Sequence, residues 1–227
     1  MNDYEKSLLM NDNIKNRLKA MSKNLKFVPR TILDIGAYEG YWSRGIKEIF
    51  PSCIPFMIEG DKNKEKILNN IGFPYEIALV ADRVKNVTFH KTNSTYTTGN
   101  SIYRECTNIF ADANPNYYTV EEKTRTLDEI VQTKGLTNID LIKIDVQGAE
   151  KDVILGGIKT VLSSKVVILE ISLIEYNRDA PQVLEMITFM DQLGFKLYDI
   201  IDFHYHLMNS SLFQFDAMFV HKNRLYS

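Results

Sequence analysis

The sequence has few cysteines: Cys53 and Cys106 are the two in 227 residues, and they form no Cys-x-x-Cys pair. Two cysteines are too few for a disulfide framework, and no Cys/His spacing suggests a zinc site. A chain of this length can bury a core large enough to fold without disulfides or a structural metal. We therefore expect both cysteines to be buried, reduced thiols, as is typical of a cytoplasmic protein.

Long apolar runs and an excess of one charge are also missing. No run approaches the roughly 18 apolar residues of a membrane span, and the first residues, MNDYEKSLLMNDNIKNRL, lack the apolar stretch of a signal peptide. The net charge is −2, from 27 Lys and Arg against 29 Asp and Glu. The sequence therefore predicts no membrane span, and no broad attraction to nucleic acid or an anionic membrane.

No linker rich in proline, glycine or serine divides the chain. We expect one α/β domain, residues 31–227, preceded by an N-terminal helical extension, residues 1–30. Residues 4–25 are typical of an amphipathic helix. Its apolar positions are spaced four, three and four residues apart: Ile14, Leu18, Met21 and Leu25. Such a helix either packs on the flank of the domain or forms a lid over the active site.

Strand-like and helix-like segments alternate from residue 31 onward. The candidate strands are Thr31–Asp34, Ile54–Glu59, Tyr75–Val80, Ile139–Val146, Val166–Ser172, Phe195–Ile201 and Phe215–His221. Two of them, IDLIKIDV and VVILEIS, have the β-branched composition of strands buried on both faces. Candidate helices are residues 42–50, a segment from the capping residue Thr126 to Gly135, and a segment from Pro181 to Gly194. This alternation predicts a doubly wound, mainly parallel sheet with helices on both faces.

Residues 84–125 interrupt the alternation. The segment VTFHK is a candidate extra strand, while TNSTYTTGNSIYRE and NPNYYT are polar and rich in turn residues. Long loops inside compact domains are usually functional or disordered. This one follows the third strand, near the carboxyl ends of the strands, so we expect it to face the substrate.

The stretch DIGAYEGYWS, residues 34–43, joins the first strand to a helix. In open α/β sheets, ligands bind beyond the carboxyl ends of the strands, where this turn lies. A dinucleotide site needs a glycine where Tyr38 stands, so that the backbone can approach a pyrophosphate. A P-loop needs a lysine followed by serine or threonine, which this turn lacks. The turn therefore favours a ligand without phosphate.

S-adenosylmethionine is a nucleoside ligand of this kind, with an amino-acid zwitterion in place of phosphate. Gly36 and Gly40 allow the backbone to pass close to a ligand, and Asp34 can bind the methionine ammonium. Glu59 ends the second candidate strand, 19 residues beyond Gly40. An acidic side chain at that position suits hydrogen bonds from ribose hydroxyls.

Three blocks of the sequence resemble the signature segments of the FkbM-type S-adenosylmethionine-dependent methyltransferases: DIGAYEGYWS, LIKIDVQGAEKDVILGG and VVILEIS. The segment TRTLDEIV is similar to a further segment of that family. The resemblance runs from about residue 31 to 220 and keeps the order and approximate spacing of the blocks. It leaves out residues 1–30, and within 92–120 it is weak beyond the step Gly99-Asn100-Ser101.

The resemblance implies a class I methyltransferase (Rossmann-like) fold, with a seven-stranded, mainly parallel sheet and an antiparallel final strand. It also implies methyl transfer to a hydroxyl group of a sugar, a polyketide or another metabolite. The turn, the strand ends and the resemblance together place the following residues at the cofactor: Asp34, Gly36, Ala37, Tyr38, Gly40, Glu59, Asp82 and Asp145. Asp82 is assigned to the adenine amine, with a hairpin turn as the alternative.

Methyl transfer to a hydroxyl requires an aligned acceptor oxygen and a group that receives its proton. Asp145 ends the run LIKI, and burial would raise its pKa toward that of a more useful base. Its alternatives are capping of the next helix or pairing with Lys143. His204 is the second catalytic candidate, because a histidine near neutrality is an apt base. It alternates with His206 just after the sixth strand, where loop histidines are often simply solvated.

Polar and aromatic residues near the strand ends and in the long loop are candidates for contacts with the acceptor: Tyr41, Asn100, Ser101, Glu170 and Tyr176. Glu170 and Asp145 would permit a Mg²⁺ site, but the sequence names no third ligand, so we expect no metal. Glu150 is expected either to cap the helix that follows Gly148 or to contact the substrate.

The sequence thus predicts an S-adenosylmethionine-dependent O-methyltransferase for a sugar, glycan or other small-molecule hydroxyl. Two alternatives are an RNA ribose methyltransferase and an inactive module that binds an adenosyl ligand. The charge balance disfavours RNA. The combination of Asp34, Glu59 and Asp145 favours an active enzyme.

Overall fold

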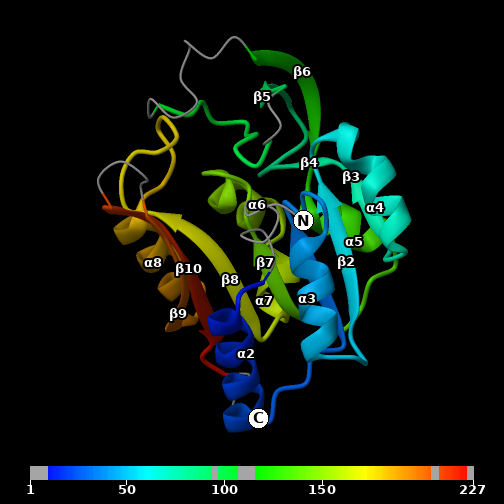
Figure 1. Cartoon of the computed structure of the whole chain (residues 1–227), viewed down its shortest axis with the longest axis vertical. Coiled ribbons are helices and arrows are strands. Elements are labelled where there is room, and N and C mark those ends of the chain that lie inside the picture. The colour runs from blue at the N-terminus through cyan, green and yellow to red at the C-terminus, as the bar shows by residue number, and fades with distance from the viewer. Residues whose placement is uncertain (1–9, 94–96, 107–115, 206–209, 224–227) are drawn as a thin grey trace.

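A computed structural model of the chain describes residues 10–93, 97–106, 116–205 and 210–223. Its main sheet has seven strands in the order β3-β2-β1-β7-β8-β10-β9 (Figure 1). Their bounds are β1 Thr31–Ile35, β2 Ile54–Glu59, β3 Tyr75–Ile77, β7 Ile139–Ile144, β8 Val166–Ser172, β9 Phe195–Tyr205 and β10 Leu212–His221. The first five strands in this order pair in parallel, and β10 is antiparallel to both of its neighbours. The expected class I methyltransferase topology, with an antiparallel final strand, is confirmed.

Helices cover both faces of this sheet, as expected (Figure 1). Their bounds are α2 Asp12–Leu25, α3 Tyr41–Ile49, the 3-10 helix η1 Lys62–Lys64, α4 Glu65–Ile71, α5 Leu127–Thr133, α6 Glu150–Gly156, α7 Ile158–Ser163 and α8 Val183–Gln192. Side chains alternate between the faces of a strand. In β1, Ile32 therefore packs with the core under α2 and α3, while Leu33 packs with the core under α5 to α8. Strands buried on both faces explain the nearly continuous apolar runs of the sequence.

The sheet face under α2 and α3 changes from apolar to charged toward the carboxyl ends of the parallel strands. Strands β1, β7 and β8 each carry a core side chain on this face and, two residues further on, a buried charged residue. In β10, which runs in the opposite direction, the buried charged residue comes two residues before the core side chain. The four charged residues are Asp34, Lys143, Glu170 and Asp216. A polar floor therefore forms at one end of an otherwise apolar layer.

The N-terminal helix α2 packs against α3 and β9. The side chain of Asn11 caps it by accepting a hydrogen bond from the Ile14 N–H at 2.9 Å. Ile14, Leu18 and Met21 are buried in the core shared with the sheet, so the expected packing on the flank is present. The first part of the predicted helix lies outside the described residues. The division into residues 1–30 and 31–227 stays a prediction.

The predicted strand Tyr75–Val80 is divided between two sheets. Its first part is β3, and its second part is β4, Leu79–Val80, in a three-stranded sheet of order β4-β6-β5. In this sheet β5 spans Asn86–Thr92, which confirms the candidate VTFHK, and β6 spans Tyr117–Arg125, which we did not expect. Two backbone hydrogen bonds mark the change of sheet. The N–H of Ala78 still donates to the backbone oxygen of Glu59 in the main sheet at 2.9 Å, whereas the N–H of Ala81 donates to the backbone oxygen of Arg125 in the smaller sheet at 3.0 Å. The smaller sheet lies above the upper end of the main sheet in Figure 1.

Two further local expectations are corrected. Cys53 is buried, but Cys106 is exposed, and both are free thiols. Pro181 precedes the capping residue Gln182 of α8, so it lies before the first turn of that helix. In the part of the chain that the structure describes, no helix combines the length and apolarity needed to span a membrane.

Candidate active site

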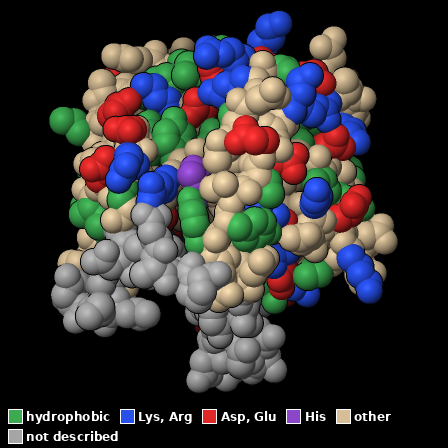
Figure 2. Space-filling view, turned by 90° about the horizontal axis from the view of Figure 1, so that it is seen from above, with side chains coloured by type: hydrophobic (Ala, Val, Ile, Leu, Met, Phe, Trp, Pro, Cys, Tyr) green, Lys and Arg blue, Asp and Glu red, His purple; other side chains and the backbone are tan. Residues whose placement is uncertain are grey.

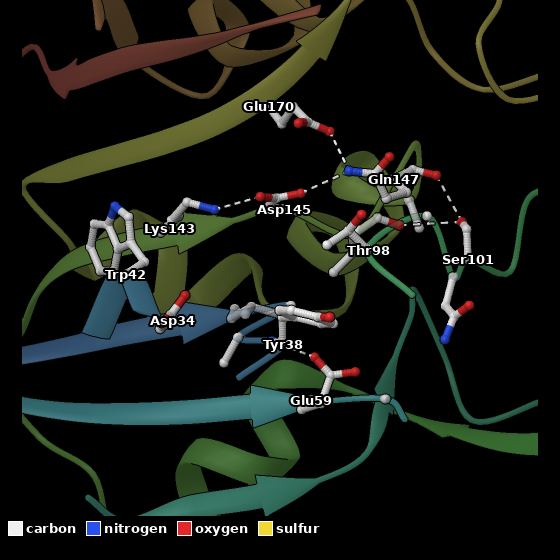
Figure 3. A pocket seen from close by; sticks show the side chains of 18 of the residues that line it. Asp34, Tyr38, Trp42, Glu59, Thr98, Ser101, Lys143, Asp145, Gln147 and Glu170 are labelled. Carbon is white, nitrogen blue, oxygen red and sulfur yellow. Dashed lines mark hydrogen bonds and ion pairs between the residues drawn. The ribbon is translucent and has the colours of Figure 1, made fainter. Parts of the chain in front are cut away.

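A cavity of about 510 Å³ opens at the carboxyl ends of the central strands. This volume lies within the range of small-molecule sites, roughly 300–1,000 Å³. The walls come from the turn after β1, the tip of β2, residues 97–102, the turn after β7 and the polar ends of β8, β9 and β10 (Figure 3). Met10 and Ile14 close one side, so the N-terminal helix reaches the cavity. The position matches the ligand crevice of open α/β sheets.

The two glycines of the turn after β1 have different surroundings. Gly36 has a φ of 80°, and a Cβ there would lie 1.7 Å from the carbonyl oxygen of Asp145. Glycine at this position therefore lets the β1 turn pack against the end of β7 while it lines the cavity. A Cβ on Gly40 would lie 2.4 Å from Ile71 of α4. Gly40 thus closes the turn against α4 and does not line the cavity.

Tyr38 takes the left-handed conformation, with a φ of 51°. Its backbone N–H donates to Glu59 Oε2 at 2.7 Å, and the N–H of Asp61 donates to Glu59 Oε1 at 2.7 Å. The ammonium of Lys64 lies 4.0 Å from the centre of the Tyr38 ring. Burial raises the pKa of Glu59 to about 7, although the two backbone donors act in the opposite direction. The Glu59 carboxyl group is therefore fixed in the cavity wall below Tyr38 in Figure 3.

Asp34 is completely buried in the floor of the cavity. The Ser43 hydroxyl donates to its Oδ2 at 2.6 Å. Its Oδ1 has no hydrogen-bond partner among the described residues. Burial raises the pKa of Asp34, and the nearby Lys143 ammonium offsets this in part. A buried carboxylate with a free oxygen is suited to a cationic group of a ligand.

Asp145 lies in the cavity wall at the end of β7. Lys143 Nζ donates to its Oδ2 at 2.7 Å, and Gln147 Nε2 donates to its Oδ1 at 3.0 Å (Figure 3). Burial acts to raise the pKa of Asp145, but the Lys143 ammonium outweighs burial and holds this pKa below its usual range. The expectation that burial leaves Asp145 with a raised pKa is therefore wrong. The alternative, pairing with Lys143, is confirmed.

Glu170 and His204 lie together on neighbouring elements of the site. Gln147 Nε2 and Gln214 Nε2 donate to Glu170 Oε2 at 2.6 and 2.9 Å, and His204 Nε2 lies 3.8 Å from Glu170 Oε1. Burial raises the pKa of Glu170 well above its usual value, and the Asp145 carboxylate raises it further.

His204 is part of β9, where it pairs with Gln214 of β10. Its expected place in a loop is therefore wrong, and His206 lies outside the described residues. Burial acts to lower the pKa of His204, but the Asp216 and Glu170 carboxylates raise it to about 9. The two carboxylates thus favour the protonated ring, which runs against the expected role of His204 as a base near neutrality.

Residues 97–102 bring two predicted acceptor contacts to the cavity. Asn100 Nδ2 donates to Asp61 Oδ2 at 3.1 Å, and Asp61 Oδ1 also accepts from Lys91 Nζ at 2.6 Å. The Ser101 hydroxyl donates to the backbone oxygen of Gln147 at 2.7 Å. These bonds tie the loop to the tip of β2 and to the turn after β7. Residues 97–102 of the long loop thus line the cavity, and the contact of this loop with a substrate stays a prediction.

The remaining predicted residues divide between the cavity and its surroundings. Tyr41 and Tyr176 line the cavity. Asp82 does not, since its carboxylate pairs with Arg83 at 3.2 Å and with Lys85 at 2.7 Å outside it. The hydrogen bond from Lys85 lowers the pKa of Asp82 despite partial burial.

Glu150 has a structural place at the start of α6. Its Oε1 accepts from the backbone N–H groups of Val146 and Gly148 at 3.0 and 3.2 Å. Burial raises its pKa to about 7, against the opposing effect of these donors. These contacts favour the capping alternative for Glu150 over a substrate contact.

Some residues of the site were not singled out from the sequence, among them Asp61, Gln147, Gln214 and Asp216. Asp216 had a recognisable signal, because it is a charged residue in the apolar strand FQFDAMFV. Gln147 has a left-handed φ of 56°, and this turn conformation lets its amide contact both Asp145 and Glu170. No pattern in the sequence predicts that the Gln147 amide contacts both carboxylates.

Comparison with known proteins gives a family for this chain. Residues 34–197 match the model of the methyltransferase FkbM domain. The 2-O-methyltransferase NoeI of Sinorhizobium fredii strain NGR234 is 32% identical, over 62% of this chain and 63% of NoeI. The chain thus aligns with less than two thirds of that relative's length.

Two solved structures are similar at low sequence identity. An S-adenosylmethionine-dependent methyltransferase from Clostridium acetobutylicum has a TM-score of 0.49 and 9% identity, over 94% of this chain and 92% of that one. The precorrin-6y C5,15-methyltransferase of Geobacter metallireducens has a TM-score of 0.49 and 11% identity, over 97% of each chain.

The family match covers well over half of the chain and contains Asp34, Glu59 and Asp145, the acidic residues of three neighbouring strand ends. It confirms the family that the sequence blocks resemble and, with it, the expected cofactor, S-adenosylmethionine. The chain belongs to the FkbM methyltransferase domain family.

Proposed function

We propose that the protein is an S-adenosylmethionine-dependent O-methyltransferase that acts on a hydroxyl of a sugar, a glycan or another small metabolite. One observation carries the proposal. Three acidic side chains from adjacent strand ends, Asp34, Glu59 and Asp145, line a single cavity beyond the carboxyl edge of the sheet. Their separate surroundings suit three separate tasks.

Glu59 and Asp34 are placed to hold the two ends of the cofactor. Glu59 accepts backbone hydrogen bonds with each oxygen, and each oxygen keeps a further lone pair for a ribose hydroxyl. Asp34 lines the cavity, and we assign its Oδ1, which has no hydrogen-bond partner among the described residues, to the methionine ammonium. Tyr38 is compatible with this ligand, because no pyrophosphate has to approach the turn.

Asp145 is placed to orient the acceptor and receive its proton. The acceptor oxygen attacks the methyl carbon while the carbon–sulfur bond breaks and its electron pair stays on sulfur. As the new bond forms, the hydroxyl proton becomes far more acidic than in a free alcohol. A carboxylate with a low pKa can therefore accept it and pass it to solvent. The network from Lys143 and Gln147 fixes the carboxylate for this step.

The lining of the cavity favours a small hydroxylated acceptor. Trp42, Tyr41 and Tyr176 supply aromatic surface beside the polar floor, and Trp42 Nε1 has no hydrogen-bond partner among the residues described. Aromatic side chains with a few polar groups are typical of small-molecule sites, and a sugar ring could stack on such faces. NoeI is a 2-O-methyltransferase by name, which also supports a hydroxyl acceptor.

RNA as the acceptor is less well supported. Lysine and arginine alternate with aspartate and glutamate on the face shown in Figure 2, without a continuous basic surface among the side chains described there. A nucleic-acid site is usually marked by such a surface. The proposal keeps the cytoplasmic location expected from the sequence, which the two free thiols support.

The affinity for S-adenosylhomocysteine is expected to fall as the pH drops below about 7. Burial raises the pKa of Glu59 to about 7 before the ligand binds, against the backbone donors of Asp61 and Tyr38. Ribose hydroxyls favour the ionised form, so protonation competes with binding and weakens it by up to about tenfold per pH unit. Calorimetric titrations between pH 5.5 and 8 measure this slope. The Glu59→Gln variant, which cannot ionise, should lose it; an equal slope in both proteins would contradict the proposal.

A screen for methyl transfer tests the function directly. The protein is incubated with radiolabelled S-adenosylmethionine and with monosaccharides, oligosaccharides, small alcohols or RNA. We expect label on a sugar or other small hydroxyl compound, and none when the acceptor hydroxyl is replaced by hydrogen. Label on RNA alone would contradict the proposal and favour the RNA ribose methyltransferase. Cofactor binding without any methyl transfer would favour the inactive module.

A further inference from the structure

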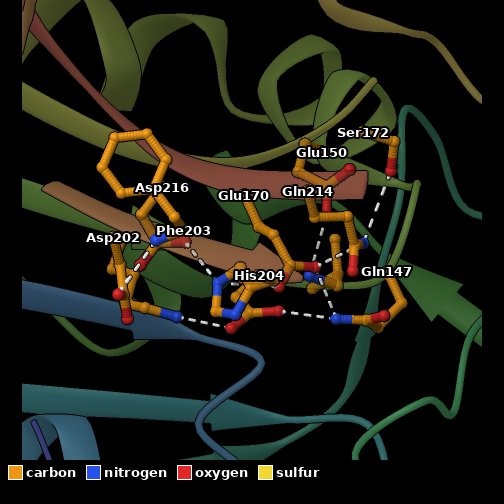
Figure 4. Close-up of polar contacts among 12 residues, drawn as sticks. Gln147, Glu150, Glu170, Ser172, Asp202, Phe203, His204, Gln214 and Asp216 are labelled. Carbon is orange, nitrogen blue, oxygen red and sulfur yellow. Dashed lines mark hydrogen bonds and ion pairs between the residues drawn. The ribbon is translucent and has the colours of Figure 1, made fainter. Parts of the chain in front are cut away.

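Three side chains with metal-binding atoms converge where β8, β9 and β10 border the cavity (Figure 4). They are Glu170, His204 and Asp216, and one ligand atom from each lies within 4.8 Å of the others. His204 Nε2 is 3.8 Å from Glu170 Oε1 and 3.8 Å from Asp216 Oδ1. Two of the three, His204 and Asp216, lie beyond the residues that match the family model.

The contacts at this point are loose, because His204 Nε2 lies at ion-pair distance, 3.8 Å, from both carboxylates without a hydrogen bond to either. Neither His204 Nε2 nor Asp216 Oδ1 has a hydrogen-bond partner in the described part of the chain. Asp216 is 5% exposed and Glu170 is 9% exposed, so both carboxylates are well removed from solvent. Buried polar groups in folded proteins normally have partners, and buried charges are normally paired or bind a metal. The buried atoms without hydrogen bonds, held at long ion-pair distances, therefore point to a missing ligand between the three side chains.

The strand register strengthens this argument. Glu170 and Asp216 lie directly opposite each other on the antiparallel strands β8 and β10. Like charges at such positions are destabilising, and their proximity makes it harder for both to ionise. Asp145 adds a third carboxylate, connected to Glu170 through Gln147. Lys143 is already bonded to Asp145, so this part of the cavity holds more acidic than basic groups.

We propose that Glu170, His204 and Asp216 bind a divalent first-row metal ion such as Mn²⁺. The ligand set, one imidazole and two carboxylates, suits these ions. The 3.8 Å separations are close to the roughly 3–4 Å between neighbouring ligands around an ion with bonds of roughly 2.1 Å. Three protein ligands leave coordination positions open toward the cavity.

The ion would have a specific use in the cavity, and this part of the proposal rests on the proposed function. An acceptor hydroxyl bound at an open position would be held near Asp145, and the ion would lower its pKa. His204 then acts as a ligand rather than as the general base expected from the sequence. Its proton leaves to solvent when the ion binds.

Binding of Mn²⁺ to the full chain tests the site without any acceptor or cofactor. Electron paramagnetic resonance counts free Mn²⁺, and calorimetry gives the dissociation constant. We expect one site per chain in the wild type, and binding weakened by at least about tenfold in Asp216→Asn and in His204→Gln. Asp199→Asn, on the same strand but paired with Arg17, is the matched control and should bind as the wild type does. Thermal denaturation checks that each variant is folded.

Failure of the metal site and failure of the proposed function give different results. Absence of Mn²⁺ binding to the folded wild type, or equal binding by all variants, would overturn the site. Full methyl transfer in EDTA would overturn the role of the ion. Binding of Mn²⁺ that depends on Asp216 and His204, in a protein that methylates no hydroxyl, would leave the site standing and reject the proposed function.

Discussion

Replacement of Asp145 by asparagine is expected to lower kcat by about 10²–10⁴-fold, with little change in the affinity for S-adenosylhomocysteine. Asparagine keeps the size of the side chain and can still accept one hydrogen bond, but it cannot receive a proton. It also leaves the Lys143 ammonium without the carboxylate to which it donates at 2.7 Å. Single-turnover kinetics measure the methyl transfer step, and calorimetry measures the affinity.

The control for this prediction is Asp191→Asn. Asp191 forms an ion pair with Lys222 at 2.5 Å outside the cavity, so its loss should leave kcat unchanged. Thermal denaturation separates a catalytic effect from loss of the fold. If Asp145→Asn is folded and turns over at the wild-type rate, Asp145 has no part in the transfer step.

Replacement of Glu59 by glutamine is expected to weaken binding of S-adenosylhomocysteine by about 10–100-fold, since hydrogen bonds to a charged group contribute about 1.5–3 kcal/mol each. The change also affects the turn itself. One of the backbone N–H groups of Tyr38 and Asp61 would face the amide NH₂ of glutamine instead of a carboxylate oxygen. The substitution would therefore weaken the contact with the ribose and disturb the conformation of the turn. Calorimetric titration with S-adenosylhomocysteine measures the effect.

Asp82→Asn is the matched control for Glu59→Gln, and it also decides between two readings of Asp82. The sequence places Asp82 at the adenine amine, whereas the structure pairs it with Arg83 and Lys85 outside the cavity. The structure therefore predicts an unchanged affinity for the Asp82 variant. Wild-type affinity in Glu59→Gln, or binding of NADH in place of S-adenosylhomocysteine, would contradict the assignment of the cavity.

Much of the fold could be predicted because strand and helix patterns alternate so regularly. The runs IDLIKIDV and VVILEIS are buried on both faces, and such strands leave a strong signal. The polar strand β6 left no such signal in the sequence, because it pairs in a small sheet whose faces are partly exposed. The end of β9 was also missed, since its extension past Ile201 depends on pairing with β10.

The cofactor side of the cavity was easier to predict than the acceptor side. Asp34 and Glu59 lie at the carboxyl ends of β1 and β2, Tyr38 follows β1, and parallel strands bring their ends to one edge whatever the details of packing. Asp216 reaches the site from an antiparallel strand, so its place depends on the register between β8 and β10. The lowered pKa of Asp145 likewise depends on a lysine whose direction the sequence does not specify.

A crystal structure of the protein with S-adenosylhomocysteine tests the central claim most directly. We predict the ribose at Glu59, the methionine ammonium at Asp34 and the sulfur directed toward Asp145, all inside the cavity at the strand ends. The claim would be contradicted by an adenosyl group bound elsewhere on the molecule, or by a cavity that stays filled with the protein's own side chains at saturating ligand.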